Sequence, residues 1–378
     1  MTKTPTPSVL DTLTLNRATL ARQLLLERAP MSAGDAVAHL LGLQAQNVKP
    51  PYYALAARLA DFDPEELSTL MAARAVVRIV TMRSTLHTHT ATDALTLRPL
   101  VQPARDRELN MFRNGLTGVD LDQLAVQARE LVEEKPRTLK QLRDALGVTW
   151  PDADPQALGI AARNTLALVQ VTPRGLWRQS GQVALTTVEH WLDRPMGPAP
   201  TPDEAVLRYL AAFGPASVKD MQTWAGVTRL RPVFERLRPR LVEFRDEHGA
   251  ELFDLPDAPR PDADTPAPAR LLPEFDNLLL SHADRTRVVP AAYKGRTWVG
   301  NRSHSVFLAD GLLAGVWRLD EPEPDGAEPV ITVEPFGTLT KAQRAEVETE
   351  AERLLAGPMG GAPGASSYDI RFGTVIGV

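Results

Sequence analysis

The stretch PRTLKQLRDALG, residues 136–147, has a near copy in PASVKDMQTWAG, residues 215–226. Both run from a proline through a threonine or serine, an aliphatic residue and a lysine to a closing glycine. Thr138 and Ser217 are residues that cap helix N-termini, and the closing glycines are typical of the position just after a helix end. The two copies therefore predict two short helices in equivalent settings.

The flanks of the two copies also match each other. An amphipathic helix is expected before each copy and another after it, and strand-like residues around a turn follow. The paired ranges are 121–135 and 202–214 for the first helices, 155–169 and 229–241 for the last helices, and 169–181 and 241–255 for the hairpins. Helix, short helix, helix and β-hairpin is the order of a winged helix-turn-helix unit.

The N-terminal part fits the same scheme less regularly. Helices are expected at 16–30, 52–62 and 63–74, and Ser32 and Gly42 are expected to start and stop another one. Residues 75–90, AVVRIVTMRSTLHTHT, are rich in β-branched residues and predict paired strands that turn near Met82-Arg83. These features predict a further winged helix, the first in the chain.

A linker rich in proline and aspartate, residues 256–270, precedes a tail of strand-like segments with one amphipathic helix at 341–357. The strand-like segments are 269–282, 286–300, 303–319, 329–337 and 366–375. We expect an α+β protein in which three tandem winged helix-turn-helix domains precede a small C-terminal β-barrel. The expected boundaries are 10–115, 116–195, 200–257 and 268–378.

Composition narrows the class of protein. The chain has 378 residues, 43% of them hydrophobic, so it can bury substantial cores. It lacks cysteine, which excludes disulfides, a thiol nucleophile and cysteine-ligated metal sites. A signal peptide and a run of eighteen apolar residues are also lacking, so we expect a cytoplasmic protein with no membrane partner, associated with the nucleoid when bound to DNA.

The net charge of −5 argues weakly against a nucleic-acid partner, but the distribution of arginine argues for one. Residues 74–113 carry seven arginines and three acids, and residues 229–245 carry six arginines and two acids. Residues 285–302 carry five basic residues and no acid. Segregated arginine is what a phosphate-binding face needs, although each cluster alone is equally compatible with an ordinary solvated surface.

The segment LGLQAQNVKPPYYAL, residues 41–55, places Gln44 and Gln46 around one alanine inside an apolar run, just before Pro50-Pro51. Such a polar pair has two interpretations. Either the two side chains bond backbone groups in a buried turn, or they face a cavity and take part in chemistry.

Several features together resemble the AlkZ/YcaQ family of bacterial DNA glycosylases: the tandem winged helices, LGLQAQ, MRSTLHTHTATD, and LLPEFDNLLLSHADR ahead of a β-rich tail. The resemblance covers nearly the whole chain. It implies three winged helices and a β-barrel around a basic DNA channel, with a catalytic motif of Gln, an apolar residue, then Gln or Asp. Gln44-Ala45-Gln46 matches the version that ends in Gln, which resembles the AlkZ branch associated with bulky alkylation and interstrand crosslinks.

Two neutral amides suit only an easily broken bond, because glutamine does not titrate near pH 7 and is no general base. Guanine alkylated at N7 is cationic and leaves as a neutral base without a general acid. Holding water near C1′ and stabilising the oxocarbenium ion then suffices, and amide carbonyls can do both. We therefore expect a monofunctional DNA glycosylase that removes N7-alkylguanine, unhooks bulky adducts or crosslinks and leaves an intact abasic site. It would serve as self-protection against a DNA-alkylating natural product.

Other residues are candidates for contact with the lesion or the DNA. They are Asn47, Tyr52, Arg83, Ser84, Thr85, His87, His89, Arg285 and Arg287. Asn47 either assists the glutamines or caps the turn, and Tyr52 either stacks on the lesion or belongs to the core. Arg83, near the expected hairpin tip, is the best candidate for insertion into DNA, with a solvated turn arginine as the alternative.

His87 and His89 lie on one face of a strand, but no third ligand accompanies them, so we expect no metal and no cofactor. Asp276 and Asp284 are expected to make structural hydrogen bonds.

Two other functions would also involve winged helices and arginine clusters: a winged-helix transcription regulator and a protein that sequesters adducts without cleaving them. A regulator would normally be a dimer, whereas three tandem units suit a monomer wrapped around double-stranded DNA.

Overall fold

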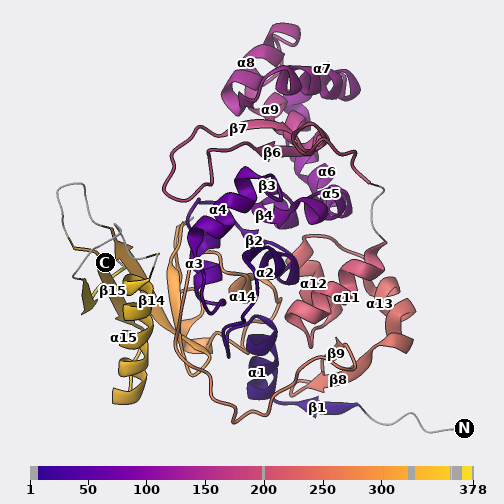
Figure 1. Cartoon of the computed structure of the whole chain (residues 1–378). Coiled ribbons are helices and arrows are strands. Elements are labelled where there is room, and N and C mark those ends of the chain that lie inside the picture. The colour runs from indigo at the N-terminus through magenta and orange to yellow at the C-terminus, as the bar shows by residue number, and fades with distance from the viewer. Residues whose placement is uncertain are drawn as a thin grey trace, which may run out of the picture.

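The computed structural model describes residues 7–197, 201–300, 302–321, 328–357, 359 and 368–376, and Figure 1 shows the arrangement of their helices and strands. The elements of the N-terminal unit are α1 (Thr12–Arg22), α2 (Ala33–His39), β2 (Leu43–Gln44), α3 (Pro50–Ala56), α4 (Pro64–Ala72), β3 (Val76–Val80), the 3₁₀ turn η1 (Met82–Ser84), β4 (Leu86–Thr90), α5 (Ala91–Leu100), α6 (Gln102–Met111) and η2 (Arg113–Leu116). The expected strand pair at 75–90 is confirmed, whereas the helix expected at 16–30 ends at Arg22.

The second unit supplies α7 (Leu121–Glu134), β5 (Arg137–Thr138), α8 (Leu139–Thr149), α9 (Pro155–Thr165), β6 (Leu168–Gln170), β7 (Ala184–Thr187) and α10 (Val188–Leu192). Its strands join those of the first unit in one six-stranded sheet, ordered β2-β4-β3-β6-β7-β5. The link is the antiparallel pairing of β3 with β6, in which Arg78 lies opposite Gln170. The first two units therefore share a sheet.

The repeated stretches form helices with the expected starts. Thr138 and Ser217 each accept a hydrogen bond from the third residue of their helix, and that residue bonds back, so both starts are capping boxes. Gly226 ends the second helix in the left-handed conformation, with φ of 73°. The expectation for Gly147 is wrong, because α8 continues through it to Thr149.

The hairpin expected at 169–181 is also only partly right. After β6 the chain turns repeatedly, and the partner strand β7 begins at Ala184. Trp177, which the sequence suggested to lie on a strand, is instead in this turning segment and is buried.

The third unit contains α11 (Pro202–Phe213), α12 (Val218–Ala225), α13 (Arg231–Leu237), η3 (Arg238–Arg240), β8 (Val242–Asp246) and β9 (Glu251–Asp254). This matches the expected order of three helices and a hairpin. The N-terminal strand β1 (Ser8–Leu10) adds to it, pairing in parallel with β8. The extreme N-terminal strand thus belongs to the sheet of the third unit.

The tail is not a closed barrel within the described residues. Its elements are β10 (Arg270–Leu272), α14 (Asn277–Leu280), η4 (Ala291–Tyr293), β11 (Trp298–Val299), β12 (Arg302–Ser303), β13 (Ser305–Ala309), β14 (Leu312–Asp320), β15 (Val330–Pro335), α15 (Lys341–Ala356) and β16 (Asp369–Phe372). Five of the strands form an open sheet, β10-β13-β14-β15-β16, whose edge strands β10 and β16 do not pair with each other. Much of 273–297, expected as strand, is turns and short helices, since Pro273 and the capping Asp276 interrupt it.

The hydrophobic cores cross the expected domain boundaries. One cluster combines Val37 and Tyr53 of the N-terminal helices with Trp317 and Ile331 of the C-terminal sheet and Val347 of α15. Figure 1 shows the C-terminal sheet beside α3 and α4. Arg353 of α15 donates to the Ala56 and Ala60 carbonyls, so this helix also contacts the first unit. The C-terminal region therefore packs against the first unit.

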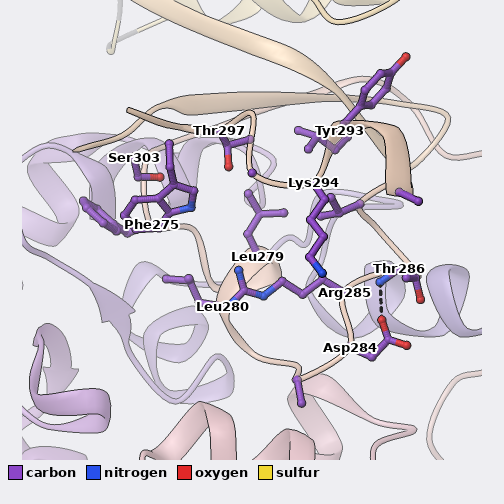
Figure 2. A pocket seen from close by; sticks show the side chains of 16 residues that line it. Phe275, Leu279, Leu280, Asp284, Arg285, Thr286, Tyr293, Lys294, Thr297 and Ser303 are labelled. Atoms are coloured by element: carbon purple, nitrogen blue, oxygen red, sulfur yellow. Dashed lines mark hydrogen bonds between the residues drawn. The ribbon is translucent and has the colours of Figure 1, made fainter. Parts of the chain in front are cut away.

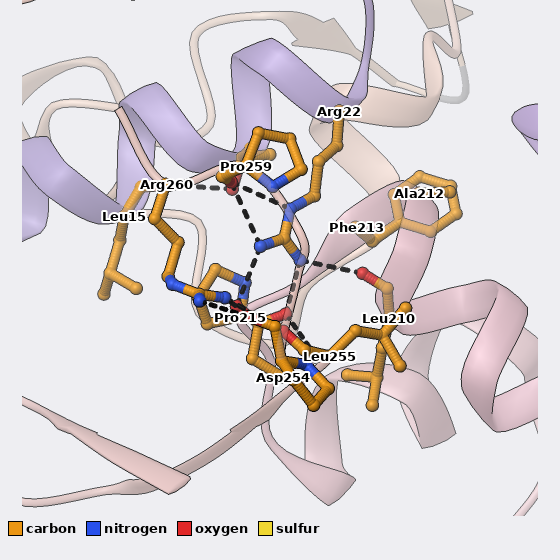
Figure 3. Close-up of polar contacts among 12 residues, drawn as sticks. Leu15, Arg22, Leu210, Ala212, Phe213, Pro215, Asp254, Leu255, Pro259 and Arg260 are labelled. Carbon is orange, nitrogen blue, oxygen red and sulfur yellow. Dashed lines mark hydrogen bonds and ion pairs between the residues drawn. The ribbon is translucent and has the colours of Figure 1, made fainter. Parts of the chain in front are cut away.

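Buried ion pairs fix the same arrangement. Arg22 of α1 bonds Asp254 at the end of β9 at 2.6 Å, and both side chains are almost fully buried. Arg260 also bonds Asp254, and Figure 3 shows both guanidinium groups converging on this carboxylate. Arg58 forms a second fully buried pair, with Asp276 at 2.8 Å. Asp276 thus has the structural role expected for it, and breaking such a pair leaves an uncompensated buried charge.

Among the described residues, no helix combines the length and the apolar composition that crossing a membrane requires.

Candidate active site

The Gln44-Ala45-Gln46 loop begins with a tight turn. Gly42 has φ of 92°, and a Cβ there would lie 2.3 Å from Cε1 of His89. Only glycine allows this close approach and this backbone conformation together. The turn brings β2 beside β4, where Gln44 lies opposite His87. Gly42 also takes part in ending α2 as expected, because its N–H donates to the Val37 carbonyl at 2.9 Å. It therefore both closes the helix end and delivers the loop to β4.

Buried side chains hold the loop backbone from two sides. Arg78 of β3 donates from Nη2 to the Ala45 carbonyl at 2.8 Å. Asn277, at the start of α14, donates from Nδ2 to the Gly42 carbonyl at 2.8 Å. Asn47, which is exposed, bonds the Glu274 carboxylate. The loop is thus positioned by the central sheet and by the stretch 274–277 of the tail.

Both glutamine side chains contact the same hairpin. The Gln44 Oε1 accepts a hydrogen bond from Arg83 Nη2 at 2.9 Å, and Gln44 is 6% exposed. The Gln46 Oε1 accepts from the Leu86 backbone N–H at 2.9 Å, and Gln46 is exposed. Bonding to a backbone group, one of the two interpretations of the sequence, thus holds for Gln46. Each carbonyl keeps a second lone pair, because an amide oxygen accepts two hydrogen bonds.

Arg83 does not point outward from the hairpin tip. Its Nη1 donates to the Trp224 carbonyl at 2.6 Å, and Gly226 packs against its backbone. Burial, with a contribution from the positive charge of Arg285, lowers the pKa of Arg83 to about 10. The side chain expected to enter DNA therefore folds back in this structure and joins Gln44 to the end of α12.

His87 and His89 are fully buried and stacked, with ring centroids 5.6 Å apart. The His87 Nδ1 is 3.0 Å from the Thr85 carbonyl, so it carries the proton, and Nε2 accepts from Arg83 Nη2 at 3.3 Å. His89 Nε2 bonds Thr81 Oγ1 at 2.8 Å. Burial lowers the pKa of both rings, that of His89 to about 4, so both are neutral at pH 7. The described residues hold no group of three potential metal ligands.

Of the remaining candidates, some lie inside the protein. Tyr52 is completely buried, donates to the Gly175 carbonyl at 2.6 Å and packs on Trp177, so it belongs to the core. Arg287 is also buried, and its Nη1 donates to the Pro215 carbonyl at 2.9 Å. Contact of either side chain with a lesion or a phosphate would require this packing to open.

Other candidates remain accessible. Ser84 and Thr85 are half-buried at the hairpin tip, where Thr85 Oγ1 donates to the Met82 carbonyl at 3.0 Å. Arg285 is exposed and lines a cavity of about 500 Å³, shown in Figure 2. Asp284, beside it, accepts from the Thr286 N–H at 2.9 Å, as expected of a structural group.

The arginine clusters are less available than their sequence density suggests. In the first cluster Arg78, Arg98 and Arg105 are buried. In the second, Arg231, Arg236 and Arg238 form salt bridges with nearby acids. Among the described residues, cations without such a salt bridge lie near 285–302, at isolated positions of the first cluster, and at the exposed Arg229 and Arg240 of the second.

Sequence reasoning missed Arg78, Glu274 and Asn277 as supports of the glutamine loop. Glu274 and Asn277 belong to the stretch LLPEFDN, which was noted only because it resembles a stretch of the family and not because it predicted contacts with the loop. No pattern marked Arg78, because an arginine on a buried strand looks like any other member of a charged cluster.

The fold and the loop define a class of protein. A sequence profile for the family described as DNA glycosylase AlkZ-like matches residues 37–356, and the chain belongs to this family of DNA glycosylases, hydrolases that act on N-glycosyl bonds in DNA. The chain is 26% identical over 368 residues to an interstrand DNA cross-link repair glycosylase of Streptomyces sahachiroi, with 89% of this chain and 93% of that protein covered.

The solved structure of Streptomyces sahachiroi DNA glycosylase AlkZ has the same fold. It superposes with a TM-score of 0.77 over 96% of this chain and 100% of that chain, at 22% sequence identity. The family prediction made from the sequence is thereby confirmed.

Proposed function

We propose that this protein is a monofunctional DNA glycosylase that hydrolyses the N-glycosidic bond of N7-alkylguanine. We also propose that it unhooks bulky adducts and interstrand crosslinks joined through guanine N7. The similarity to an interstrand DNA cross-link repair glycosylase of Streptomyces sahachiroi supports this substrate class. The observation that carries the proposal is the placement of two amide side chains against one hairpin, with Gln46 exposed.

The chemistry follows from what amides can supply. Gln46 offers its second lone pair to a water, because its first is used by the Leu86 N–H. Gln44, fixed by Arg83, directs its amide dipole toward the developing positive charge on the sugar. Neither amide protonates a leaving base, so the base must leave unaided, as a cationic N7-alkylguanine does.

Glu274 adds a negative charge beside this loop through its bond to Asn47. A carboxylate near C1′ stabilises an oxocarbenium-like transition state electrostatically. In this proposal Glu274 both positions Asn47 and supplies this negative charge.

The test uses a duplex with one N7-methylguanine, cleaved at abasic sites by alkali after incubation. We expect Gln44→Ala and Gln46→Ala to slow excision by on the order of 10²-fold, the scale of losing one preorganised polar group. DNA affinity should stay within a few-fold of the wild-type value. Gln123→Ala, an exposed glutamine on α7, is the matched control and should excise normally.

Wild-type rates in both glutamine variants would contradict the proposed roles. Tight binding without any release of base would instead favour a protein that sequesters adducts. Rapid removal of uracil, or a covalent adduct trapped with borohydride, would show an acid or an amine nucleophile that this proposal lacks.

We further propose that the protein acts on double-stranded DNA as a monomer in the cytoplasm, and that it protects its host from a DNA-alkylating natural product. All three helical units, and the tail residues that hold the glutamine loop, come from one chain, which supports action as a monomer. Sedimentation of the protein with and without a duplex tests this stoichiometry.

A further inference from the structure

The cavity of about 500 Å³ beside α14 has no role in hydrolysis by the glutamines. Its volume falls within the ~300 to 1,000 Å³ typical of ligand sites. Leu279, Leu280 and Val289 form an apolar wall of the cavity. Phe275 and Trp298, also in the lining, pack edge-to-face with ring centroids 5.6 Å apart. Trp298 is 39% exposed, so aromatic surface is open to an occupant.

The cavity is connected to the glutamine loop. Phe275 directly follows Glu274, whose carboxylate bonds Asn47, and Asn47 directly follows Gln46. On another wall, Arg285 lies near enough to Arg83 for its charge to lower the pKa of Arg83. Asn47 is therefore linked to the cavity through Glu274 and Phe275, and Arg83 is linked to it through Arg285.

The charges around the cavity suit DNA. Arg285 and Lys294 line it, as Figure 2 shows, and neither forms a salt bridge within the part of the chain that the structure describes. Asp284, also in the lining, accepts from the Thr286 N–H, and the two cations outnumber this one carboxylate. Two free cations at the rim of an aromatic cavity fit an apolar group that is still attached to a phosphodiester strand.

We infer that this cavity binds the apolar aromatic appendage of a bulky N7-alkylated guanine while the nucleotide itself lies at the glutamine loop. The inference rests on the proposed function and specifies its substrate. Arg285 and Lys294 hold the phosphates on either side of the damaged nucleotide, and the Phe275–Trp298 pair stacks on the appendage. A methyl adduct leaves the cavity empty.

The experiment compares duplexes that carry either N7-benzylguanine or N7-methylguanine, which are both cationic in the nucleotide, leave as neutral bases and differ only in the alkyl group. Ala291→Trp places a large side chain at the cavity, whereas Ala292→Trp changes its exposed neighbour, which does not line the cavity. We expect Ala291→Trp and Trp298→Ala to lower the ratio of kcat/KM for the benzyl over the methyl substrate roughly tenfold, the scale of losing one aromatic stack. Ala292→Trp should leave the ratio unchanged.

An unchanged ratio in both cavity variants, or an equal loss on both lesions, would overturn the inference while leaving the proposed function standing. Failure of the wild-type protein to release either base would refute the proposed function instead. In that case the affinities of the wild-type protein and Ala291→Trp for the two duplexes decide the inference separately. A preference of the wild-type protein for the benzyl duplex that Ala291→Trp abolishes supports it, and equal affinities overturn it.

Discussion

Replacing Arg83 with methionine removes three hydrogen bonds of one charged side chain, to the Trp224 carbonyl at 2.6 Å, to Gln44 Oε1 at 2.9 Å and to His87 Nε2 at 3.3 Å. Hydrogen bonds to charged groups contribute about 1.5–3 kcal/mol each. In the proposed mechanism the bond to Gln44 fixes the amide that faces the sugar, and about 1.4 kcal/mol corresponds to a tenfold change in rate. We therefore expect Arg83→Met to slow excision of N7-methylguanine roughly 10- to 100-fold.

The assay separates positioning from DNA binding. Single-turnover rates at saturating enzyme report the bound complex, and fluorescence anisotropy at several salt concentrations reports affinity. Arg113→Met, an exposed member of the same arginine cluster, is the matched control. If Arg83→Met excises at the wild-type rate once bound but loses affinity, with a log–log salt slope smaller by about 0.9, Arg83 binds a phosphate and its positioning role is refuted.

Three further outcomes follow from buried groups. Asp276→Asn should lower the free energy of unfolding by about 3–5 kcal/mol, because Arg58 keeps a buried charge without its partner, and urea titration measures this. Gly42→Ala should slow excision more than it weakens DNA binding, since its Cβ would clash with the His89 ring of β4 and push β2, which carries Gln44, away from β4; a normal rate would show that the turn is dispensable. The unfolded chain protonates His89 near pH 6.5 and the folded chain only near pH 4. The contribution of neutral His89 to the free energy of unfolding should therefore be complete above pH 6.5 and decrease as the pH is lowered from 6.5 to 4. The decrease in the free energy of unfolding over this range should be smaller in His89→Gln, which has no ring to protonate.

Local signals in the sequence predicted local structure well. Thr138, Ser217 and Gly226 have the capping roles that their types suggested, because caps depend on a few neighbouring residues. Gly147 does not end its helix, because α8 continues for two more residues, to Thr149. A glycine inside a helix costs only about 1 kcal/mol relative to alanine, which the surrounding helix can outweigh.

Side-chain direction was the part that sequence could not give. Arg83 was placed at the right turn, but its contact is the Trp224 carbonyl, 141 residues away along the chain. Arg287 and Tyr52 were chosen by residue type, and both are enclosed by segments far from them in sequence. Pairings of this kind, like that of β3 with β6, are set by tertiary packing and leave no local pattern.

The support of the glutamine loop by Asn277 and Glu274 spans 235 and 227 residues of sequence. During synthesis Gln44 and Gln46 leave the ribosome long before these supports exist. Until the tail arrives, Gly42 and Asn47 lack the partners that set the loop. Under the proposed mechanism, base release would therefore require translation to have passed Asn277, and a prematurely terminated product would carry both glutamines without these supports.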